Sequence, residues 1–131
     1  MSHSRRTRHE YSFAPGGEPD LAAMRTWLRA VLDGETSDDV EDALLMATEL
    51  VTNAFDHAHG ARTLRVCCRG PGSAGRLEID DARPELELHF DGEAPKGMRG
   101  RGLLLVDAIS PRWGVTRTGT LKTVWADLAG P

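Results

Sequence analysis

The chain has 131 residues, 40% of them hydrophobic, and a formal net charge of −4. This length suits a single domain with one core, which we expect over residues 13–131, after residues 1–12 as a flexible tail or a first strand. A negative net charge gives no general attraction to polyanions, so direct nucleic-acid binding is not expected. No apolar run approaches the roughly 20 residues of a membrane span, and the amino terminus lacks a signal-peptide core, which favours a cytoplasmic protein without membrane contact.

Two helices are predicted in the first half of the chain. Asp20 is a suitable cap for the first helix, whose apolar residues recur at helical spacing until Gly34 ends it. The second helix begins near Ser37, because acidic residues in its first turns interact favourably with the helix dipole. It ends before Gly60.

The second half of the chain predicts two hairpins with a long loop and a third helix between them. Alternating apolar residues and turn-rich breaks indicate four strands, over residues 62–69, 76–81, 113–118 and 121–128. Residues 82–99 contain two prolines and little periodicity, which is typical of a functional lid or a disordered loop. A buried helix follows Gly102 and stops at Pro111.

The two cysteines, Cys67 and Cys68, are adjacent in a predicted strand. Side chains of neighbouring strand residues point to opposite faces, so these thiols are not expected to bond to each other. Neither has a Cys or His at metal-ligand spacing. We therefore expect small structural thiols in a reducing compartment.

A carboxylate, a carboxamide and an imidazole recur at i, i+4 spacing on the second predicted helix, at Glu49, Asn53 and His57. At this spacing the three side chains share one face of the helix. They lie along the edge of an apolar stripe, so we expect them to border a pocket that is able to hold a metal ion. The alternative is an ordinary solvent-facing set of polar residues.

Asp81 follows Leu77 and Ile79 on one face of a predicted strand, so a run of inward apolar residues ends on a carboxylate. A buried carboxylate needs a hydrogen-bond donor from the protein or from a ligand. The exocyclic amine of adenine is such a donor. The alternative is an aspartate that caps the turn at Pro84.

Glycines at positions 97, 100 and 102 directly precede the third predicted helix. Glycine lets backbone amides turn toward a ligand and a helix amino terminus adds partial positive charge, a combination that suits phosphate. Lys96, Arg99 and Arg101 add charge-assisted donors. The spacing matches neither the Rossmann nor the Walker fingerprint, and a flexible loop is the alternative. Residues 119–123 alone indicate only a turn.

Taken in chain order, these segments resemble the boxes of the GHKL ATP-binding superfamily, which includes gyrase, histidine kinases and mismatch-repair ATPases. Within it the chain is most similar to the small bacterial anti-sigma-factor serine/threonine kinases. The matching stretches are Glu-Leu-Val-Thr-Asn-Ala, Gly-Arg-Gly-Leu-Leu-Leu-Val and Lys-Thr-Val-Trp-Ala-Asp-Leu, and the resemblance runs from about Phe13 to the end. It implies the Bergerat fold, a two-layer α+β sandwich with a mixed, mainly antiparallel sheet covered on one face by three helices. ATP is then expected between the helices and a lid of residues 82–101.

The resemblance also implies roles for individual residues. Asn53 would bind Mg²⁺ bridging the ATP phosphates, and Glu49 would be the general base that accepts the proton of an attacking serine. Asp81 would bind the adenine amine, with Thr123 nearby through a water. His57 would orient the end of the helix without being a catalyst. The remaining cofactor-binding residues would be Lys96, Gly97, Arg99, Gly100, Arg101, Gly102 and Leu103.

The implied function is that of a homodimeric anti-sigma factor that sequesters a sigma factor and phosphorylates a STAS-domain antagonist. One departure is Arg83, because the superfamily usually has glycine two residues after the adenine-binding aspartate. It favours an alternative, a non-catalytic interaction module that binds nucleotide weakly or not at all. A third reading is a detached histidine-kinase catalytic domain, which needs a partner with the phosphoacceptor histidine. A complete histidine kinase is not expected here.

Overall fold

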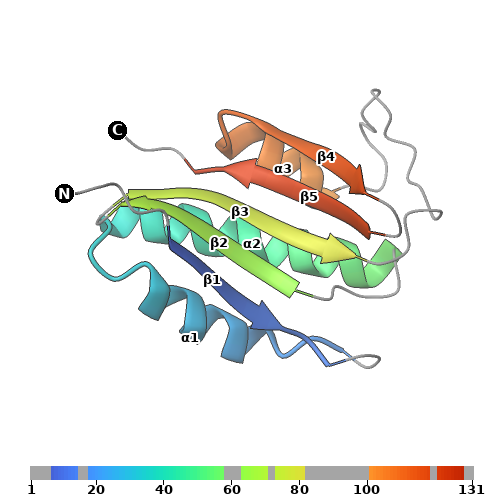
Figure 1. Cartoon of the computed structure of the whole chain (residues 1–131), viewed down its shortest axis with the longest axis horizontal. Helices are drawn as coiled ribbons and strands as arrows, with labels where there is room; N and C mark the ends of the chain where they lie inside the picture. The colour runs from blue at the N-terminus through green and yellow to red at the C-terminus, as the bar shows by residue number, and fades with distance from the viewer. Residues whose placement is uncertain are drawn as a thin grey trace.

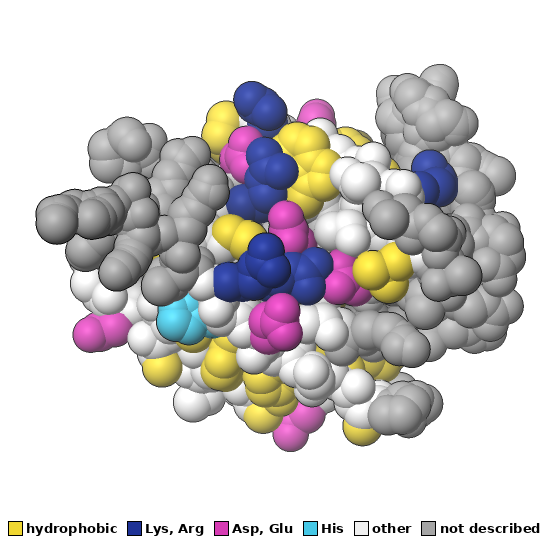
Figure 2. Space-filling model, in the orientation of Figure 1, with side chains coloured by type: hydrophobic (Ala, Val, Ile, Leu, Met, Phe, Trp, Pro, Cys, Tyr) yellow, Lys and Arg dark blue, Asp and Glu magenta, His cyan; other side chains and the backbone are white. Residues whose placement is uncertain are grey.

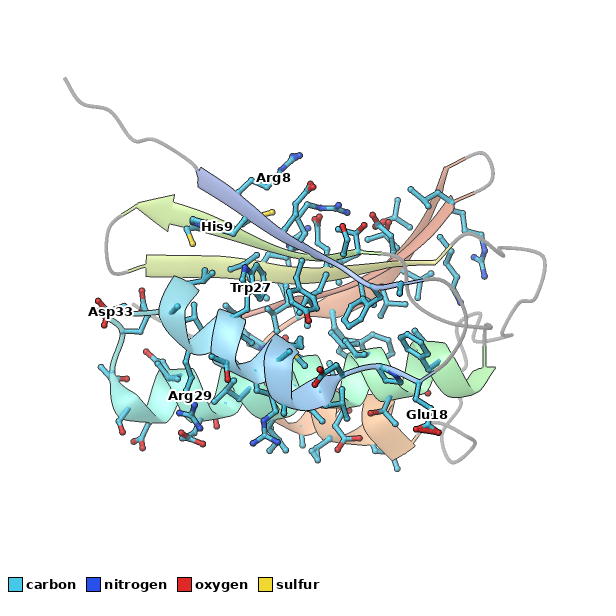
Figure 3. The ribbon with its side chains drawn as sticks, turned by 90° about the horizontal axis from the view of Figure 1, so that it is seen from below. Arg8, His9, Glu18, Trp27, Arg29 and Asp33 are labelled. Atoms are coloured by element: carbon cyan, nitrogen blue, oxygen red, sulfur yellow. The ribbon has the colours of Figure 1, made fainter. Side chains whose placement is uncertain are left out.

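A five-stranded sheet carries three helices on one of its faces in the computed structural model of the chain (Figure 1). The structure describes residues 7–14, 18–57, 63–70, 73–81, 101–118 and 121–128. The view at right angles shows the two layers edge on, with the helices below the sheet and none of the described helices on its other face (Figure 3). The predicted two-layer α+β sandwich is therefore confirmed. We call the side of the sheet without a described helix the open face.

The strands are β1 (Thr7–Ser12), β2 (Thr63–Gly70), β3 (Ser73–Asp81), β4 (Trp113–Thr118) and β5 (Leu121–Asp127). They lie in the order β1-β2-β3-β5-β4, so the last described strand is inserted between two earlier ones. The four pairings between described strands are all antiparallel, where a mixed, mainly antiparallel sheet was the expectation. This order makes β3 and β5 neighbours although α3 and β4 separate them in the chain.

The helices are α1 (Leu21–Val31), α2 (Ser37–His57) and α3 (Arg101–Ile109). Asp20 caps α1, because its carboxylate accepts a hydrogen bond of 3.0 Å from the amide of Ala23. Gly34 has a φ of 104°, a left-handed conformation that glycine adopts without strain, just beyond the end of α1. Both signals act within one turn, so the sequence alone was enough to locate this helix.

Buried apolar side chains from both layers form one core. The inward residues alternate along each central strand and meet the apolar stripes of α1 and α2. Each fully buried Leu, Ile, Val or Met stabilises the fold by roughly 1.5–3 kcal/mol relative to exposure. The largest fully buried side chains are Met24, Leu28, Leu44, Met46, Leu50, Val51, Leu64, Val66, Leu77, Ile79 and Val106.

An aromatic cluster fixes the edge strand β1 to the helices. The ring of Tyr11 lies 5.4 Å from that of Trp27 on α1, and Phe13 lies 5.6 Å from Phe55 on α2, centroid to centroid. Trp27 points from α1 toward the sheet, whereas Arg8 projects from β1 on the opposite side (Figure 3). Aromatic side chains of the first strand and of the residue that follows it thus hold the strand against the helical layer.

Helix α2 is the central element of the helical layer and packs against α1, α3 and β3. Its carboxyl-terminal end, the end of β3 and the start of β5 all lie at one end of the molecule (Figure 1). We call this the cleft end, because the resemblance implies a nucleotide-binding cleft there. None of the described helices is long and apolar enough to cross a membrane.

Candidate functional site

Helix α2 brings Glu49 and Asn53 to the border of the core. Both side chains are half-buried, one turn apart, beside the fully buried Leu50 and Val51. Among the described residues, neither the Glu49 carboxylate nor the Asn53 carboxamide has a hydrogen-bond or ion-pair partner. Half-buried polar groups without protein partners are available to a ligand. His57 is the last residue of α2, and its side chain lies outside the described part of the structure.

Asp81 is the last residue of β3, and its Cα is paired with that of Lys122 on β5. The side chain of Asp81 is outside the described part of the structure. Lys122 is buried, with only 4% of its surface exposed, on the face of β5 that also carries the core residues Val124 and Ala126. An ammonium group therefore enters the helix-covered side of the sheet beside the position of Asp81.

Thr123 occupies the other face of β5, which corrects the expectation that it lies beside the adenine. Its hydroxyl donates a hydrogen bond of 2.8 Å to the Asp80 carboxylate. Side chains alternate along a strand, so the inward position belongs to Lys122 and Thr123 points to the open face. The alternation of Val124 and Ala126 was the signal in the sequence that identifies Lys122 as inward.

The glycine-rich segment is described only at its end. Lys96, Gly97, Arg99 and Gly100 lie outside the described residues. Arg101, Gly102 and Leu103 are the first three residues of α3, described by their backbone alone. The helix therefore begins at Arg101, two residues earlier than the start after Gly102 that the sequence predicts, and its first amides have no partner within the helix. Such a helix terminus suits an anionic group.

Contacts after its last turn fix α3 to the sheet. Ser110 is buried, and its hydroxyl oxygen lies 2.7 Å from the carbonyl oxygens of both Arg112 and Asp127. The indole Nε1 of Trp113 donates a hydrogen bond of 2.8 Å to the Asp107 carboxylate. These bonds connect α3 to β4 and β5, so the helix has a defined direction relative to the sheet.

Arg65 is the centre of an ion-pair network on the open face. Its guanidinium contacts the carboxylates of Glu78 and Asp80, both at 2.7 Å, and that of Glu10 at 3.7 Å. The hydrogen bond to Asp80, aided by the one to Glu78, raises the pKa of Arg65 above its usual value although burial lowers it. Figure 2 shows basic and acidic side chains gathered over the middle of this face.

A second paired set lies beside this network. Arg76 contacts the Asp127 carboxylate at 2.6 Å and lies 3.9 Å above the ring of Trp125. Cys67, on the neighbouring strand, is a free thiol whose pKa is raised by burial and, to a lesser extent, by the charge of Glu78. The described charges of the open face are thus largely neutralised by one another.

The donor set fits a magnesium ion only if phosphate supplies further ligands. Within the described ranges, no group of three His, Cys, Asp or Glu side chains is placed to hold a metal ion. Magnesium prefers oxygen ligands and keeps several waters, and it commonly takes one or two protein oxygens together with substrate phosphates. The carboxamide oxygen of Asn53 meets that requirement.

Comparisons with known proteins identify the family of the chain. An uncharacterized protein of Streptomyces coelicolor is 34% identical to this chain over 88 residues, which cover 63% of this chain and 81% of that protein. The family model of the histidine kinase-like ATPase domain matches residues 16–128, a segment that contains all three helices and strands β2 to β5. The chain therefore belongs to the histidine kinase-like ATPase domain family.

Proposed function

We propose that the protein binds Mg·ATP at the cleft end and is an anti-sigma factor with serine/threonine kinase activity. It would sequester a sigma factor and phosphorylate a STAS-domain antagonist. The observation that carries this proposal is the pair of half-buried, uncommitted polar groups, Glu49 and Asn53, on α2 of a histidine kinase-like ATPase domain. A carboxylate and a carboxamide one turn apart provide a proton acceptor and an oxygen ligand at one site.

Phosphoryl transfer assigns distinct tasks to these two residues. The serine or threonine oxygen of the antagonist forms a bond to the γ-phosphorus, the bond from that phosphorus to the β–γ bridging oxygen breaks, and ADP leaves. Glu49 orients the hydroxyl and accepts its proton. Asn53 would hold the magnesium through its carboxamide oxygen. The ion neutralises charge on the phosphate oxygens when it is bound.

Three further elements would complete the nucleotide site. Asp81 accepts a hydrogen bond from the adenine amine. By the resemblance, the glycines and basic side chains of residues 96–102 would bind the phosphates together with the amino terminus of α3. The predicted homodimer is part of the same proposal, and sedimentation of the purified protein measures it.

Nucleotide binding is tested first, by calorimetry of ATP with and without magnesium. We expect binding that magnesium strengthens and that Asp81→Asn weakens, since a site built around one hydrogen bond discriminates strongly against its loss. If neither change alters affinity, the assignment of the site is wrong.

Phosphotransfer is tested with labelled ATP, magnesium and a STAS-domain antagonist. We expect Glu49→Gln to lower transfer by about 10²–10⁴-fold while leaving ATP affinity nearly unchanged, because a general base acts mainly in the transition state. Glu41→Gln is the matched control, a glutamate on the same helix that is exposed and paired with Arg29. Equal transfer by the natural protein and Glu49→Gln would remove Glu49 from the mechanism.

A second candidate function is a non-catalytic regulatory module of the same fold. Arg83, in the place of the superfamily's usual glycine, favours this reading. Its signature would be tight binding of a sigma factor or an antagonist that does not depend on ATP, with no label transferred to any antagonist. ATP-dependent label transfer that requires Glu49 would exclude it.

A further inference from the structure

Lys122 is a buried cation on the inner side of the sheet. It lies on β5 among core residues, with Val124 two positions along the same face. Removing an ammonium group from water is costly unless it donates hydrogen bonds to protein or ligand. Lys122 has an interaction within the folded protein, and an ammonium group with three N–H donors can also serve a ligand. Lys122 lies near the start of β5, at the cleft end, where the proposed nucleotide site lies.

The register of the sheet places Lys122 beside Asp81, the proposed adenine acceptor. The Cα atoms of Lys122 and Asp81 are directly paired across β5 and β3. Directly paired residues of antiparallel strands are the closest neighbours in a sheet. One position supplies a carboxylate that only accepts, and the other an ammonium that only donates. An acceptor next to a donor complements a base edge that offers a donor next to an acceptor.

Adenine has such an edge, with the N6 amine beside the ring nitrogen N1. We propose that Lys122 determines nucleotide specificity by donating a hydrogen bond to N1 while Asp81 accepts one from the amine. This role rests on the proposed ATP-binding function. Guanine in the same pose offers an oxygen to Asp81 and an N–H to Lys122, so both contacts become repulsive and GTP is rejected.

The test compares ATP with 1-deaza-ATP, in which a C–H group replaces N1. The natural protein should bind ATP at least about tenfold more tightly than 1-deaza-ATP, since a hydrogen bond from a charged donor is lost in the analogue. Lys122→Met should bind ATP about tenfold more weakly than the natural protein and should not distinguish the two nucleotides. Lys122→Arg, which keeps a donor, should retain part of the discrimination.

Lys96→Met is the matched control, because Lys96 is the other lysine of the chain and is assigned to the phosphates. We expect this substitution to weaken the binding of ATP and of 1-deaza-ATP equally. The control therefore separates a general loss of positive charge from a lost hydrogen bond to the base. Thermal unfolding of each variant checks that it folds. The comparison of the two nucleotides on the natural protein needs no variant at all.

Two outcomes overturn this role of Lys122 while leaving ATP binding intact. One is equal affinity of the natural protein for ATP and 1-deaza-ATP. The other is a Lys122→Met variant that binds ATP as tightly as the natural protein or more tightly, which would mean that the lysine fills the site when it is empty. Failure of the natural protein to bind ATP contradicts the proposed function itself, and this role with it.

Discussion

The open face and the cleft end differ in whether their polar side chains have partners within the protein. On the open face, Arg65 binds three carboxylates and Arg76 binds Asp127. At the cleft end, Glu49 and Asn53 have no partner among the described residues. Paired charges stabilise a fold and have little left to offer a ligand, whereas uncommitted groups at a half-buried position retain their binding capacity.

Because of this difference, we expect ligand binding at the cleft end and not on the open face. The open face carries the more conspicuous charges (Figure 2), yet its arginines are engaged with neighbouring acids. At the cleft end, Glu49 and Asn53 are the residues that we propose for nucleotide binding. Substitutions on the open face should therefore change stability, and substitutions at the cleft end should change binding.

The largest effect is expected at Arg65. Arg65→Met leaves Asp80, whose side chain is only 10% exposed, without its guanidinium partner. Losing one partner of a buried pair costs roughly 3–5 kcal/mol of unfolding free energy, which urea denaturation measures. The control is Arg29→Met, since the Arg29–Glu41 pair is about half exposed on both sides and should be worth less than about 1 kcal/mol. Similar losses in the two variants would contradict a structural role for the open face.

Asn53→Ala tests the opposite side of the comparison. We expect about a tenfold loss of affinity for Mg·ATP, or about 1.4 kcal/mol, because the magnesium loses its carboxamide ligand. Affinity for ATP without magnesium should stay nearly constant, as should the unfolding free energy. Calorimetry and urea denaturation give these values. A variant that loses stability but not magnesium dependence would place Asn53 with the structural residues.

Gly114→Ala probes the packing of the open face. A Cβ atom at this position would lie 2.9 Å from the ring of Trp125. The guanidinium of Arg76 also contacts this ring, 3.9 Å from its centroid. Overpacking typically costs about 1–3 kcal/mol, while replacing a strand glycine by alanine regains roughly 0.5–1 kcal/mol. The steric cost outweighs that gain, so we expect a net destabilisation of about 1 kcal/mol in thermal or urea unfolding. A stabilised variant would show that the tryptophan ring moves freely.

The smallest effect concerns Cys67, tested in a Cys68→Ser background. Burial raises the pKa of this thiol in the folded protein above its unfolded value. The folded state therefore holds the proton more tightly, and the associated stability is full below the ordinary thiol pKa and is lost as pH rises through the folded value. Unfolding free energies at increasing alkaline pH should fall less when Cys67 is also replaced by serine. Identical pH profiles would show that the thiol is not perturbed.

Local signals in the sequence were sufficient to place the helices and strands, although β3 begins at Ser73 and not at Arg76. The cap at Asp20 and the left-handed residue Gly34 act over a few residues, and both ends of α1 follow from them. The i, i+4 spacing of Glu49 and Asn53 likewise fixes their common face, since it depends on one helix alone. Family membership and the two-layer fold are confirmed, while the chemical roles of these two residues stay predictions.

Pairings between distant segments were not accessible in the same way. The network around Arg65 depends on the register of β1, β2 and β3, which no single strand specifies. The alternation of apolar residues along β5 indicates that Lys122 points inward. The family resemblance instead implied Thr123 as the residue near the adenine. The hydrogen bond from Thr123 to Asp80 joins residues 43 positions apart, and only the folded sheet reveals it.

The strand order has a consequence for synthesis on the ribosome. Because β5 lies between β3 and β4, the middle of the sheet stays open until residues 121–127 have emerged. A nascent chain that ends earlier holds β4 with no neighbour to pair with, and it lacks the lysine that faces the core. Pairing across such a sequence separation is a slow, non-local step. The proposed nucleotide site is thus complete only after translation has passed this segment, so binding of a purine there would report completed folding.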